Sequence, residues 1–261
     1  MKEKKNVVIM PCLDMRDGRV VKGVRFVDIR DAGDPVECCA AYCKADADEI
    51  AMLDITATVE GRATMLDVVR RVAEVATVPF TVGGGISDTR GAAAVLEAGA
   101  DKISTSSAAF RKPDAIREMV TEFGAERVTV AIDAAQNPET PSGYEVYIDG
   151  GRTATGTDAV EWAKTVDGFG VRTILPTSKS TDGVRNGYDL PLIRAIKAVT
   201  SADVVASGGA GKLDHFLAAV DAGAAVLLAA SVFHFSIIGI RELKTYLNRH
   251  GVPVRLRRKG A

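Results

Sequence analysis

Two aspartates stand where a carboxylate could carry out acid–base chemistry. Asp14 ends the apolar run "VVIMPCLD" (7–14), and Asp133 stands near the end of "VTVAIDA" (128–134). Both runs have strand composition, so each Asp is expected at a strand end. If the two strands face each other, the carboxylates reach one opening and suit paired general acid and base work. The structural alternative is that each Asp caps a helix or, for Asp14, pairs with Lys22.

A glycine pattern that occurs twice is the second chemical signal. Four residue pairs share one constant spacing: Gly84 with Gly208, Gly85 with Gly209, Gly99 with Gly223, and Ser107 with Ser231. In each copy a Gly-Gly step is followed by a helix ending in Ala-Gly-Ala, a strand and a Ser. Repetition in one register predicts an internal duplication, with halves of about 1–124 and 125–261.

The repeated pattern is suited to anion binding. A glycine pair lets the backbone approach a ligand closely, and a Ser at a helix N-terminus adds donors in a favourable dipole field. A nucleotide loop of the Gly-Lys-Ser/Thr type is excluded, because Lys212 is followed by Leu213. Two such sites across one opening predict a ligand with a phosphate at each end. The alternative is that the glycines only turn the chain.

The elements that position these residues alternate along the whole chain. Strands are expected at 7–14, 49–56, 78–84, 102–106, 128–134, 173–178, 203–209 and 224–231. Helices are expected at 35–45, 65–76, 89–100, 113–124, 158–170, 190–200, 213–224 and 240–251. Eight strand–helix units without a Gly-x-Gly-x-x-Gly loop after the first strand predict an α/β fold, a single (β/α)8 TIM barrel domain over 1–261.

Two segments stand outside this alternation. Residues 15–34 form a long link after the first strand, and a connection of that length is generally functional. Residues 137–157 contain "YEVYIDGG" and predict a hairpin that turns at Asp149, Gly150 and Gly151.

The composition limits the classes of function. The chain has 261 residues and a formal net charge of −1, which argues against a general nucleic-acid binder. No apolar run is long enough for a membrane span, and the start does not resemble a signal peptide, so a cytoplasmic location is expected. Four cysteines, Cys12, Cys38, Cys39 and Cys43, are expected as buried thiols. His215 and His234 stand alone, so neither a metal site nor a cofactor is predicted.

Several longer motifs resemble one enzyme family. "PCLDMRDGRVVKGVRF", "LDITAT", "FTVGGGI", "ASGGAGKLDHF" and "AASVFHF" resemble the cyclase subunit of imidazole glycerol phosphate synthase, from about residue 6 to residue 256. The resemblance implies a barrel that forms a heterodimer with a glutaminase subunit and receives ammonia from it. The substrate would be a phosphoribulosyl aminoimidazole-carboxamide nucleotide with two phosphates. The products would be imidazole glycerol phosphate and aminoimidazole-carboxamide ribotide.

The resemblance also implies roles for individual residues. Asp14 and Asp133 fall on the catalytic pair, and Lys22 falls on a lysine of the mobile loop. One phosphate site would use Gly85, Ser106 and Ser107; on or near the other lie Gly183, Gly208, Gly209, Ala230 and Ser231, and Thr177 and Asp182 are further candidates for substrate or phosphate binding. Asp54 is a further strand-end carboxylate, but its counterpart in the other half is taken as Pro176, so a structural or positioning role is expected.

The chain departs from the family pattern at three places. The loop after the sixth strand reads "TSKSTDGV", and Ser106 stands where an Asn is usual. At the ammonia-entry face Glu49 and Lys102 remain of a ring of four charges, whereas Val8 and Thr173 replace an Arg and a Glu. The substitutions predict retained cyclase chemistry with altered coupling to a glutaminase.

Two other functions stay open. One is the isomerase of the preceding histidine step, which is also a duplicated barrel with two phosphate sites. The motifs "LDITA", "HFLAAVDAGA" and "ASVFHF" favour the cyclase over it. The other is a non-catalytic barrel that serves as a binding or assembly subunit, which the altered loop after the sixth strand would suit.

Overall fold

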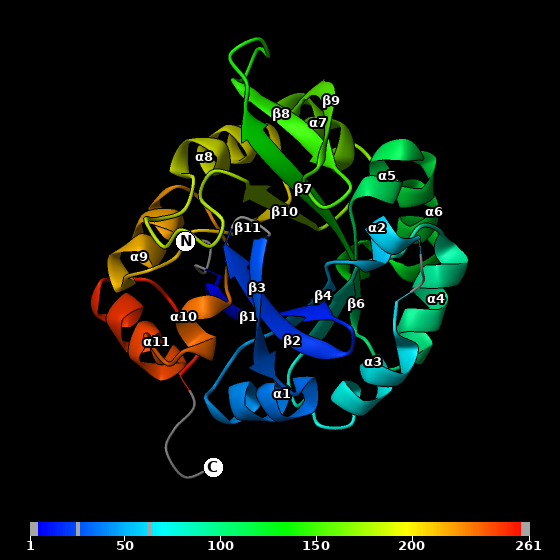
Figure 1. Cartoon of the computed structure of the whole chain (residues 1–261). Coiled ribbons are helices and arrows are strands. Elements are labelled where there is room, and N and C mark those ends of the chain that lie inside the picture. Colours follow the sequence, from blue (N-terminus) through cyan, green and yellow to red (C-terminus); the bar gives the residue numbers. More distant parts are fainter. Residues whose placement is uncertain (1–4, 25–26, 62–63, 257–261) are drawn as a thin grey trace.

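Eight parallel strands close into a barrel (Figure 1). The computed structural model describes residues 5–24, 27–61 and 64–256, with the backbone alone at 22–24, 27–30 and 59. The barrel strands are β1 (Val8–Arg16), β4 (Ile50–Asp54), β5 (Phe80–Gly83), β6 (Lys102–Thr105), β7 (Val128–Gln136), β10 (Thr173–Ser178), β11 (Asp203–Ala206) and β12 (Val226–Ala229). Strand β12 pairs with β1 and β7 pairs with β10, which closes the ring. All eight predicted strands and the barrel are confirmed.

Helices surround the barrel on its outside (Figure 1). The eight predicted helices are confirmed as α1 (Pro35–Lys44), α3 (Leu66–Ala73), α4 (Thr89–Glu97), α6 (Asp114–Phe123), α7 (Ala159–Asp167), α8 (Leu190–Val199), α9 (Leu213–Asp221) and α11 (Ile240–Arg249). Helix α1 begins as its sequence suggests, with Pro35 in the first turn and the Asp34 carboxylate accepting from the Val36 N–H at 2.9 Å. The structure adds three short helices, α2 (Ala57–Glu60), α5 (Ser107–Arg111) and α10 (Ser231–His234), and a 3-10 turn at Ala125–Arg127.

A hairpin follows β1 and another follows β7. The predicted hairpin at 137–157 is confirmed as β8 (Tyr144–Ile148) and β9 (Thr153–Asp158). The long link at 15–34 contains two strands that were not predicted, β2 (Arg19–Val24) and β3 (Val27–Gly33); β2 pairs antiparallel with both the end of β1 and β3. The overlooked signal is Asp17-Gly18, whose positive φ angles of 51° and 75° make the two-residue turn between β1 and β2.

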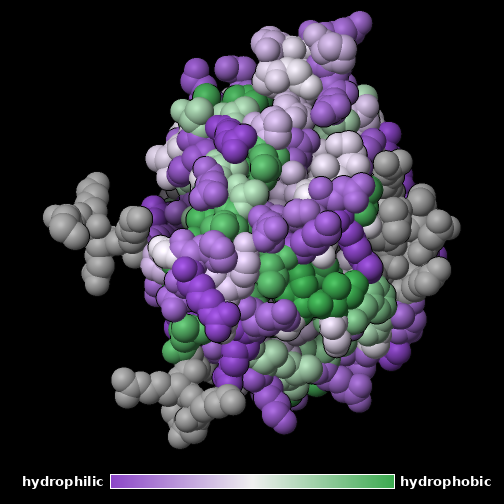
Figure 2. All heavy atoms as spheres, turned by 90° about the vertical axis from the view of Figure 1, so that its left-hand side faces the viewer, coloured by the Kyte–Doolittle hydropathy of each residue, from purple (hydrophilic) through white to green (hydrophobic). Residues whose placement is uncertain are grey.

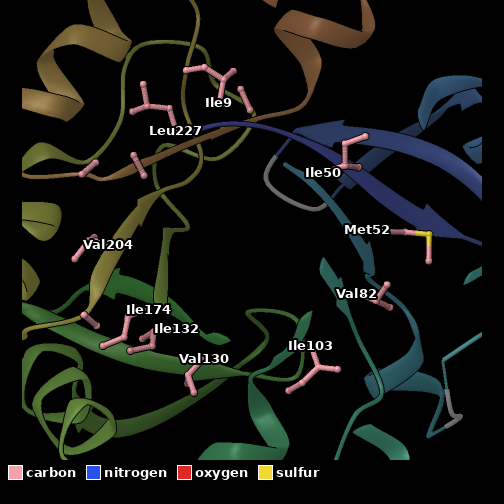
Figure 3. Close-up of a cluster of buried hydrophobic side chains, with 14 of the residues drawn as sticks. Ile9, Ile50, Met52, Val82, Ile103, Val130, Ile132, Ile174, Val204 and Leu227 are labelled. Carbon is pink, nitrogen blue, oxygen red and sulfur yellow. The ribbon is translucent and has the colours of Figure 1, made fainter. Parts of the chain in front are cut away.

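The core has two parts, separated by the barrel wall. Strand residues such as Ile9, Ile50 and Ile174 point outward and are covered by the helices (Figure 3). Each such side chain contributes about 1.5–3 kcal/mol through burial. A smaller apolar cluster that includes Met10 and Leu175 fills the barrel interior below the strand ends. This packing holds the strand ends, and therefore the site, on a rigid frame.

A buried ion cluster ties the last helix to the barrel. Lys244 of α11 is fully buried, and its Nζ lies 2.8 Å from Asp48 Oδ1 and 3.7 Å from Asp46 Oδ2. Arg255 Nε also binds Asp48 Oδ1 at 3.0 Å, while Asp48 Oδ2 accepts from the Ile9 N–H. These contacts join the C-terminal segment to β1 and to the turn before β4.

The outer surface over α8–α11 is mainly hydrophilic, with a smaller hydrophobic area (Figure 2). Phe235, Ile237 and Leu256 are the large apolar side chains exposed within the described residues. None of the described helices has the length and hydropathy needed to cross a membrane.

Candidate active site

A cavity of about 490 Å³ opens at the carboxyl ends of the barrel strands. In (β/α)8 barrels this end carries the variable loops and the chemistry. The cavity is lined by twelve of the residues singled out in the sequence: Asp14, Gly85, Ser106, Ser107, Asp133, Thr177, Asp182, Gly183, Gly208, Gly209, Ala230 and Ser231. Residues from both halves of the chain therefore meet in one place.

The two candidate acid–base residues approach the cavity from opposite walls. Asp14 belongs to β1 and Asp133 to β7, and the strand order places β4, β5 and β6 between them on one side. The other side of the ring holds β10, β11 and β12. Four strand steps separate the pair in either direction, as the paired arrangement requires. Asp14 Oδ1 also accepts from Cys12 Sγ at 3.2 Å.

The surroundings of Asp133 favour its protonated form. Desolvation inside the barrel mouth, with a smaller effect from the Asp182 carboxylate, raises the pKa of Asp133 to about 7, and the Lys179 ammonium opposes this. Lys179 is held by Tyr147, with its Nζ 3.7 Å from the ring centroid. Tyr147 of β8 pairs with Asp133 in the hairpin ladder. A carboxyl group with a pKa near neutrality can both donate and accept a proton at physiological pH.

Asp54 has a structural position at the edge of the cavity. Its Oδ1 accepts from the N–H groups of Thr56 at 3.3 Å and Ala57 at 3.1 Å, and so supports the start of α2. The strand register corrects its assigned counterpart. Met15 pairs with Asp54 and Ala134 with Ser178, so the residue equivalent to Asp54 is Ser178 rather than Pro176.

Backbone conformation matches between the two glycine sites. Gly84 and Gly85 have φ angles of 96° and 74°, and Gly208 and Gly209 have 78° and 107°. Left-handed φ values of this kind favour glycine. Ser106 and Ala230, the residues before α5 and α10, also match, with φ, ψ of −138°, −96° and −118°, −75°. The cavity therefore has two backbone-lined sites with matching conformation. We call them the Ser107 cradle, formed by Gly84, Gly85, Ser106 and Ser107, and the Ser231 cradle, formed by Gly208, Gly209, Ala230 and Ser231.

The glycines of "ASGGAG" also make room for the loop after β10. A Cβ on Gly209 would lie 2.1 Å from the Gly187 carbonyl oxygen, and one on Gly211 would lie 2.1 Å from the Arg185 oxygen. The Gly187 N–H donates to the Gly209 oxygen at 2.8 Å. The same holds in the first half, where a Cβ on Gly84 would lie 2.2 Å from the Asp54 oxygen. The absence of side chains at these glycines therefore allows the loops to pack closely.

Two arginines that sequence reasoning missed line the cavity. Arg111 of α5 lies at the Ser107 cradle, and Arg185 lies at the Ser231 cradle, where its Nε donates to Ser231 Oγ at 3.2 Å. They do not occupy equivalent chain positions, so the repeat could not reveal them. A cation close to each cradle would have been the general signal of an anion site.

The remaining candidates of the sequence have other outcomes. Lys22 belongs to β2, but its side chain lies outside the described part of the chain. His215 Nδ1 accepts from the Gly211 N–H at 3.1 Å and therefore stabilises the glycine turn. His234 Nδ1 lies 2.6 Å from the Tyr42 hydroxyl. Cys39 and Cys43 are buried in α1, and Cys38 is half-buried, while Cys12 is buried in the barrel interior and also lines the cavity.

Charged residues lie at the opposite end of the barrel. Lys102 Nζ contacts Glu49 Oε1 and Oε2 at 2.7 and 2.9 Å, and both side chains are half-buried. Val8 and Thr173 are the first residues of β1 and β10 and supply no charge. A pair that the sequence had not suggested, Lys5 with Asp203 at 2.6 Å, lies at the start of β11.

The fold and the site define a class, a (β/α)8 barrel whose cavity at the strand ends is lined by two strand-end carboxylates from opposite walls. The chain matches the family model described as "Histidine biosynthesis protein" over residues 8–239. It therefore belongs to that family, whose members are isomerases and cyclases of histidine biosynthesis that act on phosphoribosyl nucleotides.

Proposed function

We propose that this histidine biosynthesis enzyme is the cyclase, a lyase that consumes ammonia and a bisphosphorylated phosphoribulosyl aminoimidazole-carboxamide nucleotide. The products are imidazole glycerol phosphate and aminoimidazole-carboxamide ribotide. The observation that carries the proposal is the pair of matched cradles in one cavity with Asp14 and Asp133 between them. This geometry also suits the isomerase, and the sequence motifs named above favour the cyclase.

The cradles would bind the two terminal phosphates. At one, the N–H groups near Gly85 and Ser107 are available, because the first N–H groups of a helix have no partner within it. At the other, Gly209 and Ser231 play the same part. A substrate gripped at both ends presents its middle to the two carboxylates, which converts proton transfer into a step between fixed groups.

Asp14 and Asp133 would act as the general acid and base of ring closure and cleavage. Asp133, with a pKa of about 7, exchanges protons readily near neutral pH. Thr177 and Asp182 would contact the substrate between the cradles. Thr177 is oriented for this by its bond to Ser207 Oγ at 3.0 Å.

Ammonia would enter from a glutaminase subunit at the opposite end of the barrel, with altered coupling. The Glu49–Lys102 pair supports an entry site there. The uncharged Val8 and Thr173 leave this ring incomplete, while the Lys5–Asp203 pair places further charge at the rim.

Turnover with an ammonium salt tests the chemistry. The protein is incubated at alkaline pH with the bisphosphate nucleotide, and loss of the substrate absorbance is followed. We expect consumption by the unchanged protein and a loss of about 100-fold or more in Asp14→Asn and Asp133→Asn, since general acid–base catalysis contributes that much. Glu118→Gln, an exposed carboxylate on α6, is the matched control and should keep full activity.

Three outcomes would overturn the assignment. Isomerisation of the upstream aminoaldose without cyclisation would identify the isomerase. Binding without turnover would identify a non-catalytic subunit, and full activity in both Asp variants would remove the acid–base roles. Comparing glutamine plus glutaminase with ammonium tests the coupling, and normal glutamine-driven efficiency would reject its alteration.

A further inference from the structure

The two cradles contain one arginine each, but the charge around the two arginines differs. At the Ser107 cradle, Arg111 Nη2 lies 2.6 and 2.8 Å from the two carboxylate oxygens of Asp149. Asp149 stands in the turn between β8 and β9, and the next residue, Gly150, lines the cavity. The carboxylate thus neutralises the guanidinium that faces this site.

Asp149 also forms a hydrogen bond with the Ser107 hydroxyl of that cradle. Its backbone N–H donates to Ser107 Oγ at 2.8 Å, and Thr153 Oγ1 donates to its carboxylate at 3.0 Å. Asp149 has a φ of 57°, a conformation that Asp and Asn tolerate better than most residues. The Arg111 guanidinium holds the pKa of Asp149 below its usual range, so the carboxylate is charged at neutral pH.

Arg185 at the Ser231 cradle has a different environment. Its partners are Ser231 Oγ at 3.2 Å and the Phe235 ring, with the guanidinium carbon 5.6 Å from the ring centroid. Neither partner carries charge, and within the described residues Arg185 forms no ion pair. The positive charge of Arg185 therefore remains available to an anion in the cavity.

The backbone of Arg185 has a left-handed conformation that the surrounding structure must enforce. Arg185 has a φ of 63°, and Gly61, at the same spacing as the other repeat pairs, also has 63°. The second half thus keeps an arginine where the first half has a glycine, although a left-handed conformation is strained for a long side chain. Gly211 leaves the space into which the Arg185 backbone fits. Strain of this kind persists where the surrounding structure enforces it, commonly at functional sites.

We propose that the cradles are unequal: Arg185 makes the Ser231 cradle the dominant phosphate anchor, and Asp149 acts at the Ser107 cradle as an internal competitor for phosphate. The inference rests on the proposed function and adds an order to substrate binding. One phosphate is held first by Arg185, and the other must displace the Asp149 carboxylate from Arg111.

Titration with inorganic phosphate, followed by the backbone amide resonances in NMR, tests this directly. We expect the amides of Gly209 and Ser231 to saturate at phosphate concentrations about tenfold lower than those of Gly85 and Ser107, since an unpaired guanidinium strengthens phosphate binding. Arg185→Asn, which tolerates the left-handed backbone, should abolish this difference. Asp149→Asn should tighten binding at the Ser107 cradle and leave the Ser231 cradle unchanged.

Controls separate the two levels of the proposal. Arg194→Asn removes an exposed charge on α8 and should leave both cradles unchanged. Equal affinities at the two cradles of the unchanged protein, or no effect of Arg185→Asn, would overturn the inequality while leaving the two-phosphate site intact. If phosphate shifts neither set of amides in a folded protein, the two-cradle function itself fails.

Discussion

At the scale of single residues, the chemistry depends on how the barrel mouth treats the Asp133 carboxyl. Desolvation and the Asp182 carboxylate raise its pKa, and the Lys179 ammonium, held against Tyr147, lowers it in part. Lys179 does not line the cavity, so its charge can be changed without removing a cavity wall.

The first prediction concerns the pH dependence of kcat/KM, which reports groups of the free enzyme. Lys179→Met removes the charge that lowers the pKa of Asp133, so the inflection near pH 7 should move upward. Lys179→Arg keeps a charge at this position and should leave the profile in place. An unchanged profile in Lys179→Met would show that the inflection belongs to another group.

The second prediction is that Asp133→Asn stabilises the fold at alkaline pH. The pKa of Asp133 in the folded protein, about 7, is above the usual value of 3.8. Asp133 therefore does not destabilise the fold below about pH 4, and it lowers the free energy of unfolding progressively as pH rises to 7. At pH 8 the charged Asp133 lowers the free energy of unfolding by roughly 4 kcal/mol at most, because each pH unit is worth about 1.4 kcal/mol. Thermal melts should show a higher Tm for Asp133→Asn at pH 8 and little difference at pH 4. An equal Tm at pH 8 would contradict it.

At the scale of elements, close backbone contacts decide where the active-site loops lie. The turn after β11 and the loop after β10 approach each other so closely that Gly209 and Gly211 have no space for a Cβ. The loop after β10 carries Asp182 and Arg185. Because Gly209 and Gly211 have no side chains, this loop can pack closely, and its packing positions both charged residues.

The third prediction compares two glycines with similar conformational strain. Gly209→Ala and Gly143→Ala both place a Cβ at a positive φ, of 107° and 79°, which costs about 1–2 kcal/mol in each case. At Gly209 the Cβ would also meet the Gly187 oxygen, whereas Gly143 has no atom within 4 Å. Only Gly209→Ala should displace the loop and raise KM by more than about tenfold. Similar KM values in both variants would show that the loop tolerates the displacement.

A fourth prediction concerns the buried Lys244. Lys244→Met leaves Asp46 and Asp48 without their buried cation and should reduce the free energy of unfolding by about 3 kcal/mol or more. Arg70→Met, which breaks the exposed Arg70–Asp67 pair, should reduce it by less than about 1 kcal/mol. Urea unfolding of both variants measures the difference, and equal effects would show that burial of the pair is unimportant.

The sequence was sufficient for the barrel and for most of the cavity lining, because alternating strands and strand-end residues follow local rules. Asp14 and Asp133 could be placed since parallel strands share one direction. Arg185 could not, because its role depends on a left-handed residue in a loop packed against Gly211. The hairpin after β1 was missed although Asp17-Gly18 is a local turn signal. Its match with the hairpin after β7 supports the proposed duplication.

At the scale of the whole molecule, the two ends of the barrel have separate tasks in the proposed function. The cavity lies at one end, and the Glu49–Lys102 and Lys5–Asp203 pairs lie at the other, with an apolar interior between them. Because the ring of strands is continuous, residues at one end of the barrel can be substituted without displacing the residues at the other end.

The fifth prediction follows from this separation. Restoring the missing charges in the double variant Val8→Arg, Thr173→Glu should raise glutamine-driven turnover with a glutaminase subunit, because the ring around Glu49 and Lys102 is then complete. Turnover with ammonium should change by less than about twofold, since neither residue lines the cavity. A loss of both activities would indicate a disturbed barrel, which circular dichroism would detect.

The closure of the sheet has a consequence for how such a protein can evolve. The ladder between β7 and β10 ends at Ser178, and every departure in "KSTDGV" comes after it. Substitutions in this loop can change the shape of the cavity without breaking any pairing between the barrel strands. Under the proposed function, a few substitutions in that one loop would therefore change which substrates of similar length and double charge the enzyme accepts.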